Sequence, residues 1–102
     1  MYYAILCEDT PNSLEKRKAV RPAHLKRLET LDKEGRLLSA GALLKQEAAD
    51  LYQAGIHGSL IVADFSNLAE AKAWISADPF VTAEVYGKIT VFPYRVSFPN
   101  EH

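Results

Sequence analysis

The chain has 102 residues, of which 48% are apolar and 25% are charged, and its formal net charge is −1. This length fits one domain with one core, over residues 1–102, and the composition is that of an ordinary globular protein. Because phosphate binding needs a basic footprint, the near-neutral charge excludes nucleic acid as an expected partner. Basic side chains do cluster over residues 16–27, but acidic residues are interleaved with them, as on a solvated helix face.

Cys7 is the only cysteine, so no disulfide can form within the chain, and nothing points to an oxidising compartment. The first residues lack the basic start of a signal peptide, and their apolar run is too short to span a membrane. We therefore expect a cytoplasmic protein with no membrane partner.

The first predicted strand covers residues 2–7, an apolar and aromatic-rich run that stops at a polar turn ending in Pro11. Its two alternating sets of side chains are both largely apolar, so we expect both faces of the strand to be covered. Residues 36–44 predict the second strand, in which Gly41 suits a bulge or a close approach of another backbone. Residues 58–65 predict the third strand, because they are nearly all apolar and are β-branched at their centre.

The last predicted strand covers residues 88–98, and Pro93 predicts that it lies at a sheet edge or is bulged there. Residues 45–55, between the second and third strands, are polar and can form a helical turn, but we interpret them as a mobile connection. Loops of this length in a compact domain are often functional.

The first predicted helix begins at a cap on Asn12 or Ser13 and continues to Glu34, before Gly35 ends it. Pro22 lies inside this helix. Since proline removes one backbone donor and clashes with the preceding turn, we predict a kink or a restart there.

The second predicted helix covers residues 67–77 with Asn67 as its cap, and residues 79–83 add one more turn. The order β-α-β-β-α-β predicts an α+β fold of the split βαβ, ferredoxin-like type: four antiparallel strands with both helices on one face. The other face of the sheet then exposes apolar side chains. A two-fold homodimer that packs sheet against sheet is the simplest way to cover them.

Two polar residues stand out at positions that suit a site. At about 100° per residue, His24 shares a helical stripe with apolar residues and faces inward; the stripe consists of Arg17, Val20, His24, Leu28 and Leu31. A histidine in such a stripe is most often a core residue, so its function stays open on this evidence. Asp78 stands at the break before Pro79, where its carboxylate either caps the next turn or orients a partner such as His24.

Six short segments, in this order and spacing, resemble the YCII-related (YciI-like) family over nearly the whole chain. They are residues 2–6 (YYAIL), 13–17 (SLEKR), 21–25 (RPAHL), 35–41 (GRLLSAG), 58–62 (GSLIV) and 78–81 (DPFV). The resemblance implies a ferredoxin-like fold of the dimeric α/β barrel type, with the dimer formed through the sheets. It also implies a pocket centred on a histidine and an aspartate, which match His24 and Asp78.

The resemblance also implies a class of reaction. Some relatives look like enzymes that eliminate chloride from hydroxylated aromatic rings, and similar dimeric folds carry muconolactone isomerisation. We therefore expect a cofactor-independent isomerase or lyase in which His24 moves a proton on a small cyclic or aromatic acid and Asp78 orients it. Many relatives have proline after Ala-Gly in the second strand, where this chain has Ala42. The pocket wall near Gly41 is thus expected to differ.

Four further residues are candidates for binding a small anionic molecule. Arg17 either holds an anionic group by a bidentate contact or lies in solvent with its stem on the core, and the pattern alone favours solvent. Arg21 and Ser59 are weaker candidates. Tyr3 is expected to be a core residue whose hydroxyl reaches the pocket rim.

No cofactor or metal is expected. His24, His57 and His102 have no metal-binding spacing. We interpret Cys7 as a small buried hydrophobic residue. The sequence carries no glycine-rich phosphate loop or dinucleotide fingerprint. Two other classes of function stay open: a non-catalytic module that binds a small ligand in the same pocket, and an RNA-binding domain, which the charge disfavours.

Overall fold

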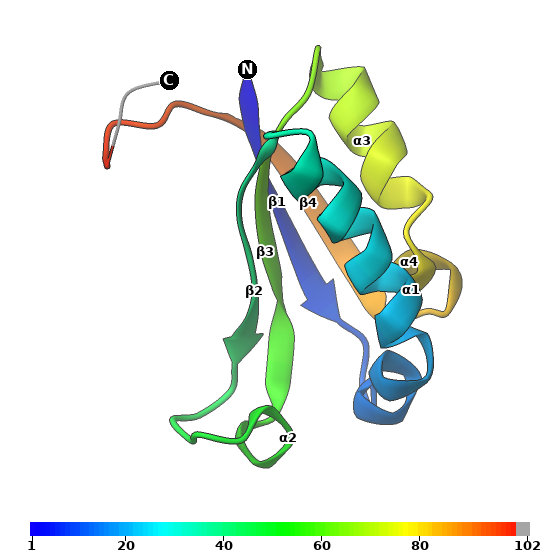
Figure 1. Cartoon of the computed structure of the whole chain (residues 1–102). Coiled ribbons are helices and arrows are strands. Elements are labelled where there is room, and N and C mark those ends of the chain that lie inside the picture. The colour runs from blue at the N-terminus through cyan, green and yellow to red at the C-terminus, as the bar shows by residue number, and fades with distance from the viewer. Residues whose placement is uncertain (100–102) are drawn as a thin grey trace.

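The structure, a computed structural model, describes residues 1–99. Its elements are β1 (Tyr2–Asp9), α1 (Leu14–Lys33), β2 (Leu37–Leu44), α2 (Leu51–Ala54), β3 (Ile56–Asp64), α3 (Leu68–Ser76), α4 (Pro79–Thr82) and β4 (Tyr86–Tyr94). The strands form one antiparallel sheet in the order β2-β3-β1-β4, and α1 and α3 lie together on one face of it (Figure 1). This is the predicted ferredoxin-like arrangement, which is therefore confirmed.

The core lies between the helices and one alternating set of strand residues. In β1 this set includes Ile5, which is opposite Ile61 of β3 and Val91 of β4. The side chains of Ile5 and Ile61 are almost fully buried, and Leu31 of α1 and Ile75 of α3 cover them from the helical layer. Burial of this apolar stripe stabilises helices whose own propensity is only moderate.

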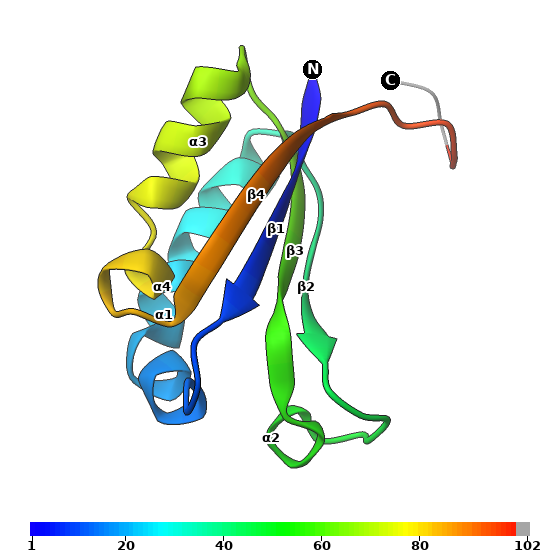
Figure 2. The ribbon, with the colours of Figure 1, turned by 180° about the vertical axis from the view of Figure 1, so that it is seen from behind.

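The opposite face of the sheet carries the other alternating set, and no helix of the described residues covers it (Figure 2). Leu60, Phe92 and Tyr94 on this face are 39%, 52% and 43% exposed. We call this surface, with Tyr2, Ala4 and Leu6 of β1 in its middle, the open sheet face. Only one face of β1 is therefore covered by helices of residues 1–99.

The first helix, α1, runs without interruption from Leu14 to Lys33 and contains Pro22, so a restart at Pro22 is wrong. The missing donor costs one hydrogen bond, and the burial of four side chains along the helix outweighs that loss. A kink at this point stays a prediction. Gly35 follows the helix with a φ of +71°, a conformation that glycine adopts without strain. None of the helices within residues 1–99 is both long and apolar enough to cross a lipid bilayer.

The glycine that a neighbouring backbone approaches closely is Gly58, not Gly41. Gly41 pairs with Leu60 in regular register, and a Cβ at Gly41 would meet nothing within 4 Å. A Cβ at Gly58 would collide with the carbonyl oxygen of Cys7 on the adjacent strand. The irregularities of the β2–β3 ladder lie elsewhere, near its two ends. The prediction of a bulge or a close backbone approach at Gly41 is therefore wrong. Which glycine is crowded depends on the register between strands, and residues distant in the sequence set that register.

The segment 45–55 contains a helix, α2, so it is more than a connection. Asp50 begins this helix by accepting a hydrogen bond from the backbone N–H of Tyr52 at 3.0 Å. Strand boundaries also differ from those predicted: β3 starts at Ile56 and β4 ends at Tyr94. The mobility of this segment stays a prediction.

Side-chain caps fix where the helices α3 and α4 begin. Asn67 accepts from the N–H of Glu70 at 2.9 Å and begins α3, as predicted. Asp78 begins α4, with Pro79 in the first helical position. The strand β4 follows, and within residues 1–99 it pairs with β1 alone, so the prediction of an edge strand with Pro93 is confirmed.

Candidate active site

His24 of α1 and Asp78, just before α4, meet in the interior. Nδ1 of the imidazole lies 2.8 Å from Oδ1 of the carboxylate, and their side chains are 8% and 0% exposed. An ionised carboxylate only accepts hydrogen bonds, so Nδ1 carries the proton that joins the pair. In the neutral ring, the lone pair is then on Nε2.

Asp78 is held by more than the histidine. Its Oδ1 also accepts the backbone N–H of Phe80 at 2.9 Å, so both interpretations of this carboxylate hold: it caps α4 and it orients His24. Its Oδ2 accepts from Nη1 of Arg27 at 3.0 Å. Burial alone would raise the pKa of Asp78, but the hydrogen bonds from His24, Phe80 and Arg27 and the attraction to His24 lower it below its ordinary value.

Two aromatic rings fix the plane of the imidazole. Phe80 stacks on His24 with ring centroids 4.0 Å apart and an interplanar angle of 10°, and Tyr86 meets it edge-on at 6.4 Å. Nε2 of His24 forms no hydrogen bond within residues 1–99. Since no fully buried side-chain nitrogen or oxygen in that part of the chain lacks a partner, this nitrogen is accessible from outside.

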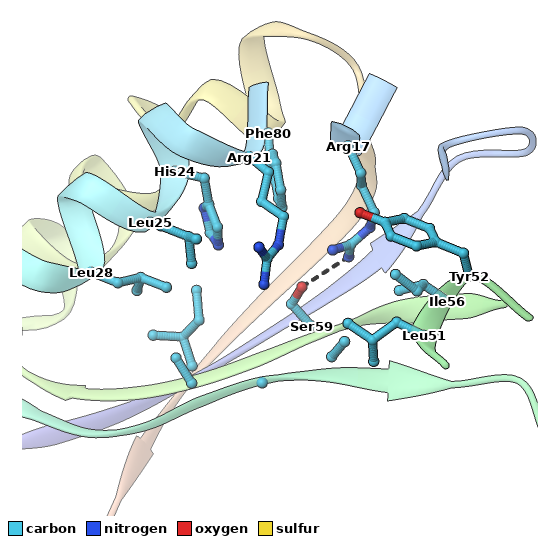
Figure 3. A pocket seen from close by; sticks show the side chains of 14 residues that line it. Arg17, Arg21, His24, Leu25, Leu28, Leu51, Tyr52, Ile56, Ser59 and Phe80 are labelled. Atoms are coloured by element: carbon cyan, nitrogen blue, oxygen red, sulfur yellow. Dashed lines mark hydrogen bonds between the residues drawn. The ribbon is translucent and has the colours of Figure 1, made fainter. Parts of the chain in front are cut away.

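His24 lines a pocket of about 240 Å³. The pocket lies between the middle of α1 and the strands β2 and β3, and α2 contributes Leu51 and Tyr52 from the far side (Figure 3). Figure 3 shows Arg17, Arg21 and His24 projecting from α1 toward the strands. One part of the wall is polar and the other is apolar, with Leu25 and Leu28 among the apolar residues. Such a wall suits a small molecule with one polar edge.

Arg17 is buried and paired, so its predicted position in solvent is wrong. Only 6% of the residue is exposed. Nε and Nη2 donate to the two carboxylate oxygens of Asp9 at 2.6 and 2.8 Å, and Nη2 also donates to Oγ of Ser59 at 2.9 Å. Arg17 lies on the inward stripe of α1, and its carboxylate partner comes from the end of β1, where the fold brings it beside α1.

Ser59 connects Arg17 to Tyr86. The phenol of Tyr86 donates to Oγ of Ser59 at 2.8 Å. Burial is the main reason that the pKa of Tyr86 is raised, so the phenol stays neutral and acts as a donor. Because Oγ of Ser59 accepts from both Arg17 and Tyr86, its own proton is left for a third partner, and Ser59 lines the pocket.

The YCII-related domain model matches residues 1–95 of this chain. The chain belongs to the YCII-related family. Protein YciI of Escherichia coli O6:H1 is 47% identical over 98 residues, which are 96% of this chain and all of that protein. An uncharacterized protein of Haemophilus influenzae is 46% identical over the same shares. Fusaric acid biosynthesis protein 2 of Gibberella fujikuroi is 26% identical, over 91% of each chain.

A solved structure shares the fold of this YCII-related chain. It is 5-chloro-2-hydroxyhydroquinone dehydrochlorinase (TftG) from Burkholderia phenoliruptrix AC1100, in complex with 2,5-dihydroxybenzoquinone. The TM-score is 0.84, with 99% of this chain and 100% of that chain covered, and 24% of the residues are identical. At this level of identity the likeness shows the ferredoxin-like fold alone.

The other predicted site residues of this YCII-related domain divide between pocket and core. Arg21 is exposed and lines the pocket, as Ser59 and Arg17 do. Tyr3 is not among the lining residues: it is 5% exposed and packs in the core near Phe65, with ring centroids 6.4 Å apart. Its predicted place at the pocket rim is therefore wrong.

Residues 1–99 hold no cluster of three or more histidine, cysteine or acidic side chains that suits a metal ion. His102 lies outside the residues that the structure describes. Cys7 is buried, and burial, followed by the negative charges of Asp78 and Asp9, raises the pKa of its thiol to about 12. The thiol is thus a buried group of low reactivity, in keeping with its interpretation as a small hydrophobe.

Sequence reasoning missed three residues that complete the site. Arg27 follows His24 by three positions, so it lies one helical turn along the same side, a spacing that is visible in the sequence. Asp9 is the last residue of β1 and was assigned only to a turn. Tyr86 lies two residues before the predicted start of the last strand, and only the strand pairing brings it to Ser59.

Proposed function

We propose that this protein is a cofactor-independent acid/base enzyme, an isomerase or a lyase, acting on a small cyclic or aromatic acid. His24 is the proposed proton carrier and Asp78 the residue that orients it. One observation carries the proposal: Nδ1 of His24 is held by a buried carboxylate while Nε2 is accessible at a pocket. A general base needs this arrangement, since the orienting bond fixes the tautomer and leaves one lone pair facing the substrate.

The proposed first step is the transfer of a proton from a carbon of the substrate to Nε2 of His24. The electron pair of the broken C–H bond moves into the ring system of the substrate. In an isomerase, the imidazolium returns the proton to another carbon. In a lyase, the pair forms a double bond and a leaving group such as chloride departs with its own bonding electrons. Asp78 stabilises the imidazolium in either case.

The polar part of the pocket wall supports an anionic or hydroxylated substrate. Arg17 is held rigidly by Asp9, and Ser59 has a proton to donate. We assign these two residues to the oxygen on which negative charge develops, because donors that are fixed in advance stabilise such charge best. Arg21, exposed at the same wall, is assigned to a carboxylate or phenolate of the substrate.

The names of the similar proteins support this class of substrate. TftG is a dehydrochlorinase whose structure contains a small dihydroxylated quinone, and one relative is named for fusaric acid biosynthesis. Both names concern small cyclic compounds. The pocket of about 240 Å³ is of a size for one such ring.

The test is deuterium incorporation in D₂O, followed by proton NMR. The probes are small hydroxylated cyclic acids and halogenated hydroquinones, with 2,5-dihydroxybenzoquinone as a binding probe. We expect the wild-type protein to catalyse exchange of a ring or α proton of at least one probe. Replacement His24→Gln should lower the exchange rate by about 10²–10⁴-fold, the usual contribution of a general base.

A matched control is His57→Gln, because the His57 side chain is 56% exposed and lies beside Glu8, which is not a residue of the pocket. This variant should exchange like wild type. Binding of a probe near His24 with neither exchange nor release of a leaving group in the wild type would contradict the enzyme and favour a non-catalytic ligand-binding module. Exchange that persists in His24→Gln would contradict the assigned base.

We also propose a homodimer that buries the open sheet face, with the cytoplasm as its compartment. The support for the dimer is the exposure of Leu60 of β3 and of Phe92 and Tyr94 of β4 on the sheet face that no helix of residues 1–99 covers. A self-complementary patch of this kind suits a two-fold interface. The buried free thiol of Cys7 agrees with a reducing compartment.

A further inference from the structure

Arg27 is the third donor to the buried carboxylate at the centre of the site. Its Nη1 donates to Oδ2 of Asp78 at 3.0 Å, on the oxygen that His24 does not use. Its Nη2 donates to the carbonyl oxygen of Trp74 at 2.8 Å, and the guanidinium lies 4.4 Å from the centroid of the Trp74 ring. The arginine is therefore fixed on three sides, although 25% of its side chain is exposed.

A carboxylate that is 0% exposed needs a positive partner, because burial of an unpaired charge is very unfavourable. Two groups within hydrogen-bond reach can supply the charge. Arg27 is positive at every pH of interest, whereas His24 is positive only after it has taken up a proton. With Arg27 in place, the charge of Asp78 is balanced before His24 is protonated.

We propose that Arg27 is a positioning residue of this site: it balances the charge of Asp78 and thereby leaves the His24 ring neutral, with Nε2 able to accept a proton. This inference rests on the proposed function, and it identifies the group that sets the protonation state of the base. Without Arg27, the carboxylate would draw a proton onto His24. The ring would then be an imidazolium, which has no lone pair with which to act as a base.

The other charged and titratable groups around the pair do not replace Arg27. On the pocket side they are Arg17, which is paired with Asp9, and Arg21, which is exposed. On the sheet side they are Cys7 and Tyr86, whose pKa values are both raised chiefly by burial, so that both are neutral. Among residues 1–99, no side chain except His24 and Arg27 donates to Asp78.

The experiment is an NMR titration of the His24 ring in the full-length protein without ligand. In the wild type, the ¹⁵N signals at about pH 7.5 should show a neutral ring with its proton on Nδ1. In Arg27→Gln, the midpoint of the His24 titration should rise, because removal of a nearby positive charge favours the imidazolium. Arg27→Lys keeps the charge and should restore most of the wild-type midpoint.

The charge-matched control is Arg36→Gln. Arg36 stacks on Phe65 and bonds to Glu34 and the Asp64 carbonyl, so its loss removes a partly buried arginine that does not contact the pair. The His24 midpoint should not move in this variant. An unchanged midpoint in Arg27→Gln, or an equal rise in Arg27→Lys, would overturn the role. If Arg27→Gln does not fold, an imidazolium in the wild type at about pH 7.5 still overturns it.

The NMR titration tests the role of Arg27, and the deuterium-exchange assay tests the proposed enzyme, so either proposal can be overturned without the other. A raised midpoint in Arg27→Gln without deuterium incorporation by the wild type would support the charge balance and overturn the enzyme. Deuterium incorporation that depends on His24 but is equally fast in Arg27→Gln, with an unchanged midpoint, would support the enzyme and overturn the role of Arg27.

Discussion

Nδ1 of His24 and Oδ1 of Asp78 lie 2.8 Å apart, although 54 positions separate the two residues in the sequence. The contact joins the middle of α1 to the residue that caps α4, so it fixes the helical layer as well as the imidazole. The contribution of this contact to stability can be measured separately from its proposed role in proton transfer, by following unfolding as a function of pH.

The stability that Asp78 contributes should depend on its ionisation. Its pKa is lower in the folded protein than its ordinary value of 3.8, so this contribution is present above that value and is lost as pH falls through the folded value. We expect Asp78→Asn to lower the free energy of unfolding by about 1–3 kcal/mol near neutral pH. Urea unfolding as a function of pH should show this gap closing in acid. A gap that is independent of pH would contradict the prediction.

The Asp9–Arg17 pair should be strongly coupled. Asp9→Asn leaves a buried guanidinium uncompensated, and we expect it to lower the free energy of unfolding by about 3–5 kcal/mol. The double variant Asp9→Asn/Arg17→Met should lose less than the sum of the single losses. Glu15→Gln is the control, because the Glu15–Lys18 pair is exposed, and it should change stability by less than about 0.5 kcal/mol. Additive losses in a double-mutant cycle would refute the coupling.

Gly58 and Gly41 should respond oppositely to alanine. A Cβ at Gly58 collides with the backbone of Cys7, which can move only with the strand, so Gly58→Ala should lower the free energy of unfolding by about 1–3 kcal/mol or more. Gly41 has open space, and Gly41→Ala should be neutral or stabilising by up to about 1 kcal/mol. Urea unfolding of both variants checks this, and equal effects would show that strand crowding is not the cause.

The thiol of Cys7 should react only when the protein opens. Burial raises its pKa to about 12, so very little thiolate exists at mildly alkaline pH, and the side chain is 0% exposed. A thiol-specific reagent should modify the native protein far more slowly than the protein in urea, which is the internal control. Rapid labelling without denaturant would be incompatible with this burial.

A charge on the open sheet face should break the proposed dimer. Phe92 is 52% exposed on that face, and Phe92→Glu should convert the dimer to a monomer in sedimentation experiments. Leu68→Glu is the control, because Leu68 is 36% exposed at the start of α3 on the helical side. It should leave the dimer intact. A wild-type protein that sediments as a stable monomer at micromolar concentration would exclude the interface.

The sequence by itself determined whatever depends on near neighbours in the chain. The stripe of α1 placed His24 inward, Asn67 and Asp78 marked helix starts, and Pro93 marked an edge strand, because helical period, caps and proline geometry act within a few residues. The tertiary structure alone decided the partners. Asp9 reaches Arg17, Tyr86 reaches Ser59, and Gly58 rather than Gly41 is crowded, because strand register and the packing of helices on the sheet bring distant segments together. Pro22 stays within one helix for the same reason: burial along α1, which depends on the whole sheet, outweighs the one hydrogen bond that proline removes.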